Sequence, residues 1–433
     1  MLTRRSFLAS SAVALGGSAL WGDSERQRPR VAFLGTVVRR HSHAQHFLDR
    51  ICEGYTWNGQ WVPPRLDVAS VYIDQVPEDD LSQDRIARYG LRQCASIAEA
   101  LTLGSGQLAV DGVVIIAEHG DYPTNEKGQK RYPRYDWFKQ VVAVFEASGR
   151  SAPVFNDKHL STVWEECVDM VADSRRLEFP FLAGSSLPVT WRLPSLDVPF
   201  DAPLSESVCV SYGGIDSYDI HGLETAQCMS ERRHGGEVGI ASVQALKDEA
   251  VYARLAREDH AETRKLFISA LCCSHNLPVE GGYPTAAVTF DWARKALPQV
   301  TAYFIEHRDG FRTSLFMTTI RDFNYAGLRS DTGEVIACQM YLPMPGHSAT
   351  TADFFNPLMR HIETLVLTGA APYPVERTLL TSGMVIAGVE SLAQGGASVE
   401  TPEMEVVYQG PTESHFRGAT AGSSARGLTI REN

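Results

Sequence analysis

The feature that most constrains the fold is a series of short, continuous apolar runs that alternate with segments of helical periodicity. Three of these runs cover residues 31–34, 113–117 and 153–155. A strand that is apolar along its whole length is covered on both faces, as in a parallel sheet packed between helices. Strands that alternate with helices also favour right-handed crossovers within one sheet. Residues 30–192 are therefore predicted to form a Rossmann-like α/β domain with a parallel sheet.

The first apolar run ends at Gly35 and leads into the sequence TVVRRHSHAQ, where Ser42 opens a capping box and marks the predicted start of a helix. A dinucleotide-binding turn at this place normally carries three glycines, which let a pyrophosphate approach the backbone. The positions of the second and third glycine hold Val37 and Arg40. Two alternatives stay open: Arg39 and Arg40 pair with the phosphates of a shifted dinucleotide, or the site no longer binds one.

After about residue 192 the pattern changes to longer helical segments, followed by alternating strands that are joined by turn sequences such as Asp309-Gly310. Residues 193–409 are therefore predicted to form an α+β domain with a largely antiparallel sheet. Residues 410–433 are rich in Gly, Ser and Thr and are predicted to be disordered. The predicted elements are helices over 221–233, 238–246, 259–271, 352–368 and 376–394, and strand pairs over 303–307 with 311–317 and 327–329 with 335–341.

The N-terminus has the features of an export signal. Arg4 and Arg5 precede a weakly apolar stretch, rich in Ala, Gly and Ser, that is too short to span a membrane comfortably. Paired arginines followed by Phe7 and Leu8 are typical of the twin-arginine type. Residues 1–22 are therefore predicted to be a signal peptide that directs the folded protein through the twin-arginine translocation machinery to the periplasm. No later stretch is apolar and long enough to predict a transmembrane helix.

Composition excludes several classes of protein. The formal net charge of −12 over 433 residues argues against a protein that follows the phosphates of nucleic acid. The 8 cysteines form no CxxC pattern, so neither a disulfide framework nor a structural zinc site is indicated.

The order of the motifs resembles the glucose-fructose oxidoreductase, inositol dehydrogenase and MocA (Gfo/Idh/MocA) family over about residues 30–407. The sequence VFNDKH resembles the strand that ends in the family's Glu-Lys-Pro motif, and HGLE resembles its His-x-x-Asp. The resemblance implies an NAD(P)-dependent oxidoreductase that acts on a carbohydrate. It also implies that the chain can form a homo-oligomer. The matching stretches are 86–90, 96–101, 110–115, 153–158, 221–224 and 374–395.

The resemblance also implies site residues. Lys158 corresponds to the lysine that holds the nicotinamide and polarises the substrate, and His221 corresponds to the acid/base histidine. The family's assisting Asp falls on Ser217, so Asp219 or its neighbour Asp216 would substitute for it.

The predicted cofactor-binding residues are those at the carboxyl ends of the first strands. Asp74 follows the second strand and is placed to receive ribose hydroxyls. The complete set is Gly35, Arg39, Arg40, His43, Asp74 and His119, for NAD or NADP.

Two other functions remain open. In the first, hydride chemistry is lost, and His43, His119 and Asp121 hold a divalent metal or catalyse hydrolysis or elimination. In the second, the protein binds a sugar without turnover. The sequence GDYPTNEKGQKRYPRYD, residues 120–136, combines Tyr with Lys and Arg, which suits a sugar or an anionic sugar derivative.

Overall fold

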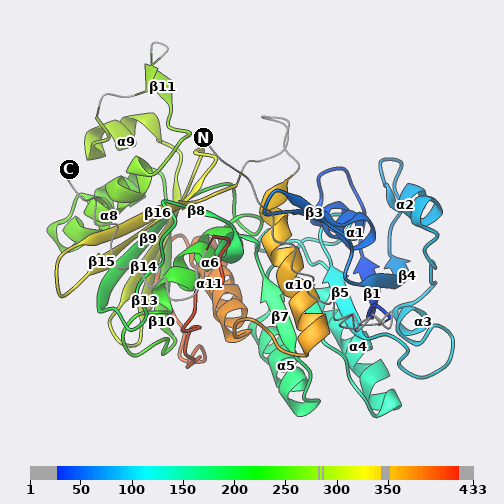
Figure 1. Cartoon of the computed structure of the whole chain (residues 1–433). Coiled ribbons are helices and arrows are strands. Elements are labelled where there is room, and N and C mark those ends of the chain that lie inside the picture. The colour runs from blue at the N-terminus through cyan, green and yellow to red at the C-terminus, as the bar shows by residue number, and fades with distance from the viewer. Residues whose placement is uncertain (1–26, 281–282, 285–286, 343–351, 419–433) are drawn as a thin grey trace, which may run out of the picture.

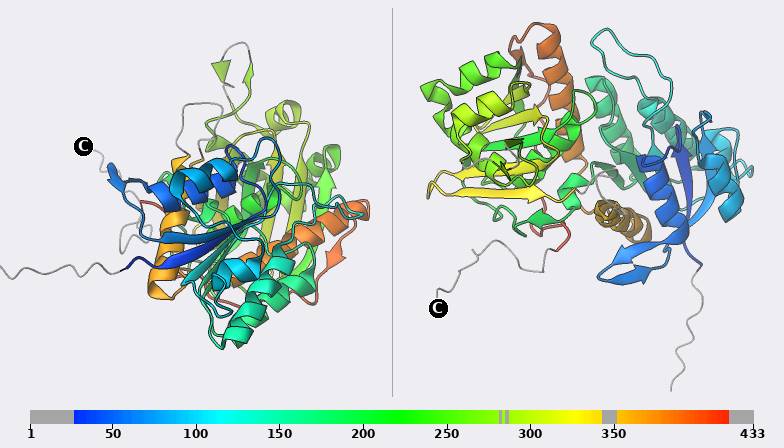
Figure 2. Two further views of the ribbon diagram at one scale, coloured as in Figure 1. Left: turned by 90° about the vertical axis from the view of Figure 1, so that its right-hand side faces the viewer. Right: turned by 90° about the horizontal axis from the view of Figure 1, so that it is seen from above.

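The computed structural model describes residues 27–280, 283–284, 287–342 and 352–418. The predicted signal peptide and residues 419–433 of the predicted tail lie outside the described residues. Two domains lie side by side, each built on one large sheet with helices against it (Figures 1 and 2).

The N-terminal domain contains a five-stranded parallel sheet with the order β4-β1-β5-β6-β7. The chain leaves β1 first toward β4 and later returns to its other side with β5, so the topology reverses between β1 and β5. In open sheets of this kind, ligands bind at the carboxyl ends of the strands near such a reversal. The strands are β1 (Arg30–Gly35), β4 (Asp67–Ile73), β5 (Gly112–Ile116), β6 (Val154–Asp157) and β7 (Phe181–Gly184).

Two helices of this domain begin directly after the serines that the sequence offers as caps. Ser42 precedes α1 (His43–Glu53) and its hydroxyl accepts a hydrogen bond from the Gln45 amide, while Ser96 caps α3 (Ile97–Thr102) in the same way. Each such cap contributes about 1 kcal/mol to helix stability. All five residues of β5 are buried, as a strand covered on both faces requires. The remaining elements are β2 (Tyr55–Trp57), β3 (Gln60–Val62), α2 (Ser82–Tyr89), α4 (Arg134–Ser148) and α5 (Trp164–Arg176).

The C-terminal domain contains an eight-stranded sheet with the order β17-β10-β13-β14-β9-β15-β16-β8. Its paired strands are antiparallel except β14 and β9, so the predicted fold class is confirmed. The strands are β8 (Arg192–Leu193), β9 (Leu204–Tyr212), β10 (Ile240–Lys247), β13 (Thr301–His307), β14 (Arg312–Thr318), β15 (Phe323–Arg329), β16 (Val335–Met340) and β17 (Val399–Glu400).

Helices pack against both faces of this sheet. On one face, α6 contacts β9 and α11 contacts β10, and on the other α8 packs on β9 and β15 (Figure 1). These contacts lie within one chain and do not test the expected homo-oligomer, which stays a prediction. The helices are α6 (Asp219–Ser230), α7 (Glu249–Leu255), α8 (Ala261–Cys272), α9 (Phe290–Ala296), α10 (Asn356–Thr368) and α11 (Glu376–Ala393), and a short pair β11 (Val279–Glu280) and β12 (Tyr283–Pro284) precedes α9.

One predicted helix is wrong. Residues 238–246 do not form a helix, because β10 occupies this segment and pairs with β13 and β17. The buried apolar residues are Ile240, Val243 and Ala245, and the strand register shifts between Ile240 and Ser242. A bulge inserts one residue and moves the next side chains to the other face. The resulting spacing of three imitates helical periodicity.

Two late segments pack back toward the N-terminal domain. The helix α10 lies against α1, and the Arg50 side chain donates a hydrogen bond to Asn356 at 2.7 Å. Tyr55 donates to Glu363 at 2.7 Å. Residues 410–418, the described part of the predicted tail, include the buried Phe416. Sequence-distant contacts therefore make α10 part of the apolar core around α1 and β1.

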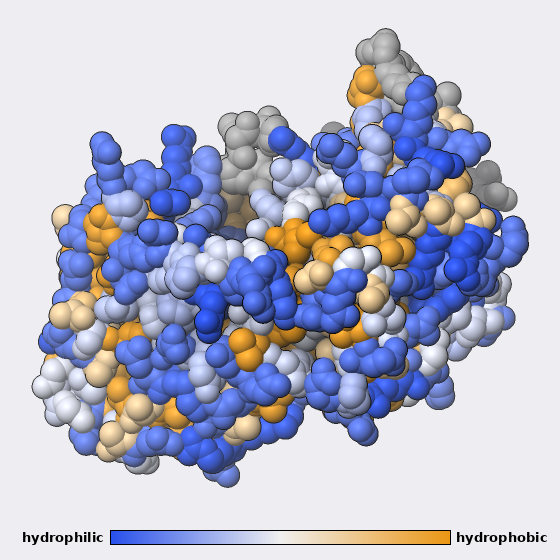
Figure 3. Space-filling model, turned by 180° about the vertical axis from the view of Figure 1, so that it is seen from behind, coloured by the Kyte–Doolittle hydropathy of each residue, from blue (hydrophilic) through white to orange (hydrophobic). Residues whose placement is uncertain are grey.

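The face seen in Figure 3 is hydrophilic over most of its area, with apolar residues in separate small patches. Within the described ranges, no helix combines the length and the apolar character needed to cross a bilayer.

Candidate functional site

A cavity of about 260 Å³ lies at the carboxyl edge of the parallel sheet. Strand register brings its polar residues together: Gly35 lies beside Ile116, and Asp157 lies beside Gly184. The residues that follow these strand ends therefore meet at one edge. The side chains that the chemistry needs are His43, Glu118, Arg134, Lys158 and His221, with Phe355 as an apolar wall.

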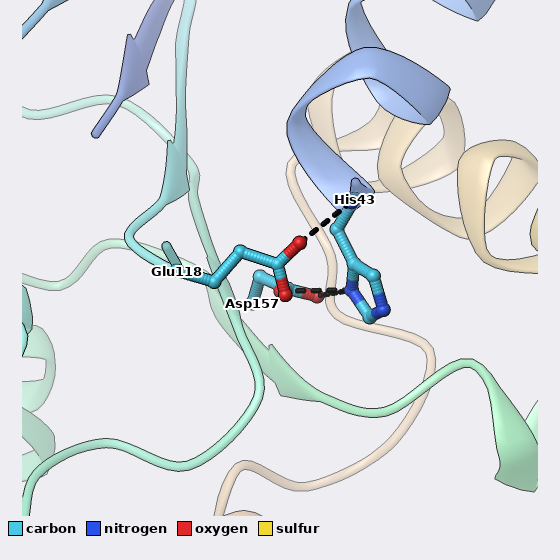
Figure 4. A group of neighbouring side chains, drawn as sticks. All are labelled: His43, Glu118 and Asp157. Atoms are coloured by element: carbon cyan, nitrogen blue, oxygen red, sulfur yellow. Dashed lines mark hydrogen bonds and ion pairs between the residues drawn. The ribbon is translucent and has the colours of Figure 1, made fainter. Parts of the chain in front are cut away.

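His43 and two carboxylates form the group drawn in Figure 4. The backbone N–H of His43, at the start of α1, donates to Glu118 at 2.7 Å. Its Nδ1 lies 2.9 Å from both oxygens of Asp157. A carboxylate only accepts hydrogen bonds, so Nδ1 carries the proton and Nε2, which points away from the carboxylates, is the free acceptor (Figure 4). Burial lowers the pKa of His43, against the opposing effect of Asp157.

Lys158 lies between the same two carboxylates. Its ammonium contacts Glu118 and lies 3.3 Å from Asp157, and the residue is 8% exposed. Burial lowers the pKa of Lys158 to about 7, because the charged form loses its water. An amine with this pKa exchanges protons readily at neutral pH, which is the property of a general acid or base.

His221 approaches the cavity from α6 in the other domain. Its Nδ1 lies 2.6 Å from the hydroxyl of Ser185, just after β7, and its ring lies 6.0 Å from that of His43. Burial, with Lys158 and His43 close by, holds the pKa of His221 well below its usual range. A neutral imidazole is therefore available, which can donate a hydrogen bond to a bound hydroxyl or accept one from it.

The backbone at this cavity is strained. Ten described residues other than glycine have positive φ, and four of them line the cavity: His41, His119, Lys158 and Asp216. Each such conformation costs about 1 kcal/mol or more and concentrates at functional sites. The strain adds to the case that this cavity is the functional site.

The structure brings four predicted site residues to this cavity: Lys158, His221, His43 and His119. Asp219, predicted to assist His221, does not line it. Its carboxyl accepts from the amides of Asp216 and Ile220 and from the Tyr303 hydroxyl, and burial raises its pKa to about 7. The contacts of Asp219 are those of a structural residue at the start of α6.

The turn after β1 offers few free groups to a pyrophosphate. The Val38 N–H donates to the Asp80 carboxylate at 2.7 Å, and the Arg39 N–H donates to the Ser42 hydroxyl at 3.1 Å. Val37 and Val38 are fully buried, and the Arg39 side chain pairs with Asp79 at 3.3 Å. Neither Gly35 nor the two arginines line the cavity that His43 and His119 line.

The residue predicted to bind the ribose hydroxyls also has hydrogen-bond partners within the protein. Asp74 accepts hydrogen bonds from Tyr72, at 2.8 Å, and from Tyr122, at 2.5 Å. Tyr122 belongs to the long loop after β5, and this loop is tied to the segment after β4 by the Gln75 side chain, which accepts from the Asp121 amide. The Asp80 carboxylate and the Ser42 hydroxyl hold turn amides, and each Asp74 oxygen already accepts from a tyrosine, so the residues do not fit a dinucleotide in its ordinary pose.

The predicted metal ligands His43, His119 and Asp121 do not come together. Within the described ranges, the group with metal-ligand spacing is instead His43, Glu118 and Asp157. The Lys158 ammonium contacts both of these carboxylates. A divalent ion would have to displace this cation, so the donor set does not fit a resident metal.

Sequence reasoning missed three residues at this site: Arg134, which lines the cavity, and Asp157 and Ser185, which contact His43 and His221. Asp157 lies within the VFNDKH motif without being marked as a site residue, and neither Ser185 nor Arg134 belongs to a recognised motif. Two signals were present: Ser185 follows the glycine that ends β7, and Arg134 lies in the basic, Tyr-rich segment before α4.

Comparison with known proteins gives a likeness of fold. No protein-family model matches the chain, and no curated protein matches it. Among solved structures, GenD2 from gentamicin A biosynthesis in complex with NAD matches with a TM-score of 0.52 at 12% identity, over 90% of this chain and 99% of that one. Myo-inositol dehydrogenase from Lactobacillus casei, in complex with NAD(H) and myo-inositol, matches with a TM-score of 0.52 at 11% identity, over 89% and 99%. A probable dehydrogenase from Thermotoga maritima matches with a TM-score of 0.51 at 12% identity, over 87% and 100%.

The sheets and the cavity between them define a two-domain α/β protein with a Rossmann-like N-terminal domain. More specifically, the chain has the Gfo/Idh/MocA-type fold that its motifs led us to expect. At this level of identity the likeness establishes the fold alone.

Proposed function

We propose that this protein is an enzyme that transforms a sugar or sugar derivative by proton transfer in this cavity, with Lys158 as the group that takes or gives the proton. The observation that carries the proposal is the position of the Lys158 ammonium, buried at the cavity between Glu118 and Asp157. A buried amine that is matched to neutral pH and faces a cavity has the properties that general acid–base catalysis requires.

The neighbouring groups have separate tasks in this proposal. Neutral Lys158 removes a proton from a carbon or hydroxyl of the substrate, and Glu118 and Asp157 stabilise the ammonium that forms. Asp157 also fixes the His43 ring, so that Nε2, which points away from the carboxylates, is the second proton-handling atom. His221 and Ser185 orient a substrate hydroxyl. Because the electron pair stays within the substrate, elimination or isomerisation by this route requires no redox partner.

Hydride transfer is the second candidate, and the fold favours it. Two solved proteins with this fold were crystallised with NAD or NAD(H). Lys158 and His221 also lie at one cavity, as expected for a sugar oxidoreductase. NAD(P) would have to bind in a pose that avoids the occupied amides of the turn after β1.

The first experiment uses the full chain produced without export. The protein is incubated with a panel of neutral sugars, keto sugars and sugar acids, with and without NAD(P), and products are identified by NMR. Turnover without NAD(P), and without nicotinamide in the extracted protein, supports the proton-transfer proposal. Turnover that strictly requires NAD(P) replaces it with the second candidate.

The second experiment asks whether Lys158 is the acting group. Lys158→Gly suits the positive φ of this position and leaves room for a small amine. We expect turnover to be lost and to return in part with added methylamine. Lys265→Met, an exposed lysine on α8, is the matched control. Full activity of Lys158→Gly would remove Lys158 from the mechanism.

We also propose that the protein is exported, on the basis of the paired arginines and apolar stretch at its N-terminus. Replacing Arg4 and Arg5 by lysine should retain the protein in the cytoplasm. Cell fractionation tests this, and unchanged export of the double variant would contradict it.

A further inference from the structure

Arg134, the first residue of α4, is a buried cation whose charge is not matched by a close carboxylate. It is 2% exposed and lines the cavity. Among the described residues it forms no ion pair, whereas other buried arginines do: Arg192 pairs with Asp197 and Arg377 pairs with Glu231. A buried charge without a partner is costly, and proteins tolerate it chiefly where function requires it.

The contacts of Arg134 leave much of its guanidinium unused. Nη1 lies 3.0 Å from Nε2 of His159, and the group lies over the Tyr132 ring at 5.0 Å from its centre. Within the part of the chain that the structure describes, the Arg134 Nε has no hydrogen-bond partner. Since His159 must be neutral to accept from Arg134, its Nδ1 carries a proton, and that atom also lacks a partner. The guanidinium thus retains donors for a ligand.

The nearby carboxylates do not supply the missing partner. Asp157 is held by His43 and Lys158, and Asp216 accepts from the Gln129 side chain at 3.2 Å and the Lys130 amide at 2.8 Å. Both act on Arg134 through space, but burial still lowers the pKa of its guanidinium. It stays charged at neutral pH, because an arginine has a pKa far above that range.

We infer that the substrate carries a carboxylate, as a uronic acid does, and that Arg134 binds this group. The inference rests on the proposed function of the same cavity. A planar carboxylate matches the paired donors of a guanidinium. A dianionic phosphate suits the cavity less, because Glu118 and Asp216 also line it. Charge neutralisation by Arg134 favours removal of a proton from the carbon beside the carboxylate, the step assigned to Lys158.

The test measures binding by calorimetry and does not depend on turnover. The probes are glucuronate, galacturonate and mannuronate, the neutral sugars glucose, galactose and mannose, and glucose 6-phosphate. We expect at least one uronate to bind about 10- to 100-fold more tightly than its neutral counterpart, the value of a hydrogen-bonded pair with a charged group. Equal affinity for each acid and its neutral counterpart, or tighter binding of the phosphate, would overturn the inference.

Variants assign the preference to Arg134. Arg134→Gln should remove the preference for the acid, because it weakens binding of the uronate more than binding of the neutral sugar, and Arg134→Lys should retain part of the preference. Arg131→Gln, three residues earlier and exposed, is the matched control and should keep the full preference. If Arg134→Gln does not fold, the Arg134→Lys variant decides, because an unchanged preference there excludes bidentate binding. A protein that binds uronates but transforms no sugar would retain this inference and refute the proposed function.

Discussion

Replacing Glu224 by glutamine tests whether burial holds this carboxyl group in its neutral form. Glu224 lies on α6, three residues after His221, and its oxygens accept from the Ser185 amide at 2.7 Å and the Thr378 hydroxyl at 2.6 Å. It is fully buried, and this raises its pKa from 4.5 to about 7. Glutamine has the shape of the neutral acid, and its amide can donate to Thr378, whose hydroxyl then donates to the Ala183 carbonyl.

The expected effect has a definite sign. Between pH 4.5 and about 7 the folded protein holds a proton on Glu224 that the unfolded chain has lost, so wild type loses stability as pH rises through this range. The glutamine variant has no such loss. We therefore expect the unfolding free energy of Glu224→Gln, relative to wild type, to increase by about 2 to 3 kcal/mol between pH 5 and pH 8.

The assay is urea unfolding followed by tryptophan fluorescence at these two pH values. Other buried titratable groups are common to both proteins and cancel in the difference. Glu405→Gln, at an exposed position, is the control and should show a difference that does not change with pH. An equally constant difference for Glu224→Gln would mean that Glu224 ionises normally, and the reasoning from burial would fail.

Three further predictions follow from single contacts. If Lys158 acts as the base, kcat/KM should rise through about pH 7 as its amine loses the proton, and a flat profile from pH 6 to 8 would argue against this role. Asp80→Ala should lower the unfolding free energy by about 1 to 3 kcal/mol in urea titrations, since the Val38 amide loses its acceptor; no loss would mean that water replaces the carboxylate. Gly184→Ala should reduce the melting temperature far more than Gly128→Ala. Both glycines have positive φ, but of the two new methyl groups only the one at position 184 would lie within 3 Å of a neighbour. Equal effects would show that the Glu224 side chain moves aside.

Features set by local sequence could be predicted, and features set by distant contacts could not. The buried strand β5, the cap at Ser42 and the hairpin at Asp309-Gly310 each depend on a few adjacent residues. Strand order then places the strand ends at one edge, so Lys158, His43 and His119 could be assigned to one crevice. The bulge after Ile240 was not visible, because its spacing of apolar residues also occurs in helices.

The pairing of side chains within the site was beyond sequence reasoning. Asp80 holds the amide of Val38 from 42 residues away, and Glu118 holds the amide of His43 from 75 residues away. Nothing in either local pattern distinguishes these carboxylates from solvated loop residues. The sequence therefore showed that the turn lacks two glycines and left dinucleotide binding open, but it did not predict that Asp80 and Glu118 accept from these amides.

In the proposed function, the poor fit to a dinucleotide in its ordinary pose and the acid/base role of Lys158 have one structural cause, and Glu118 connects them. One of its oxygens accepts from the first amide of α1, a position where a helix favours a phosphate or other anion. Its other oxygen contacts the Lys158 ammonium. A pyrophosphate at this amide would displace Glu118 and remove a counter-ion of Lys158. Binding of a dinucleotide in the ordinary pose and the present arrangement of Lys158, Glu118 and His43 are therefore mutually exclusive.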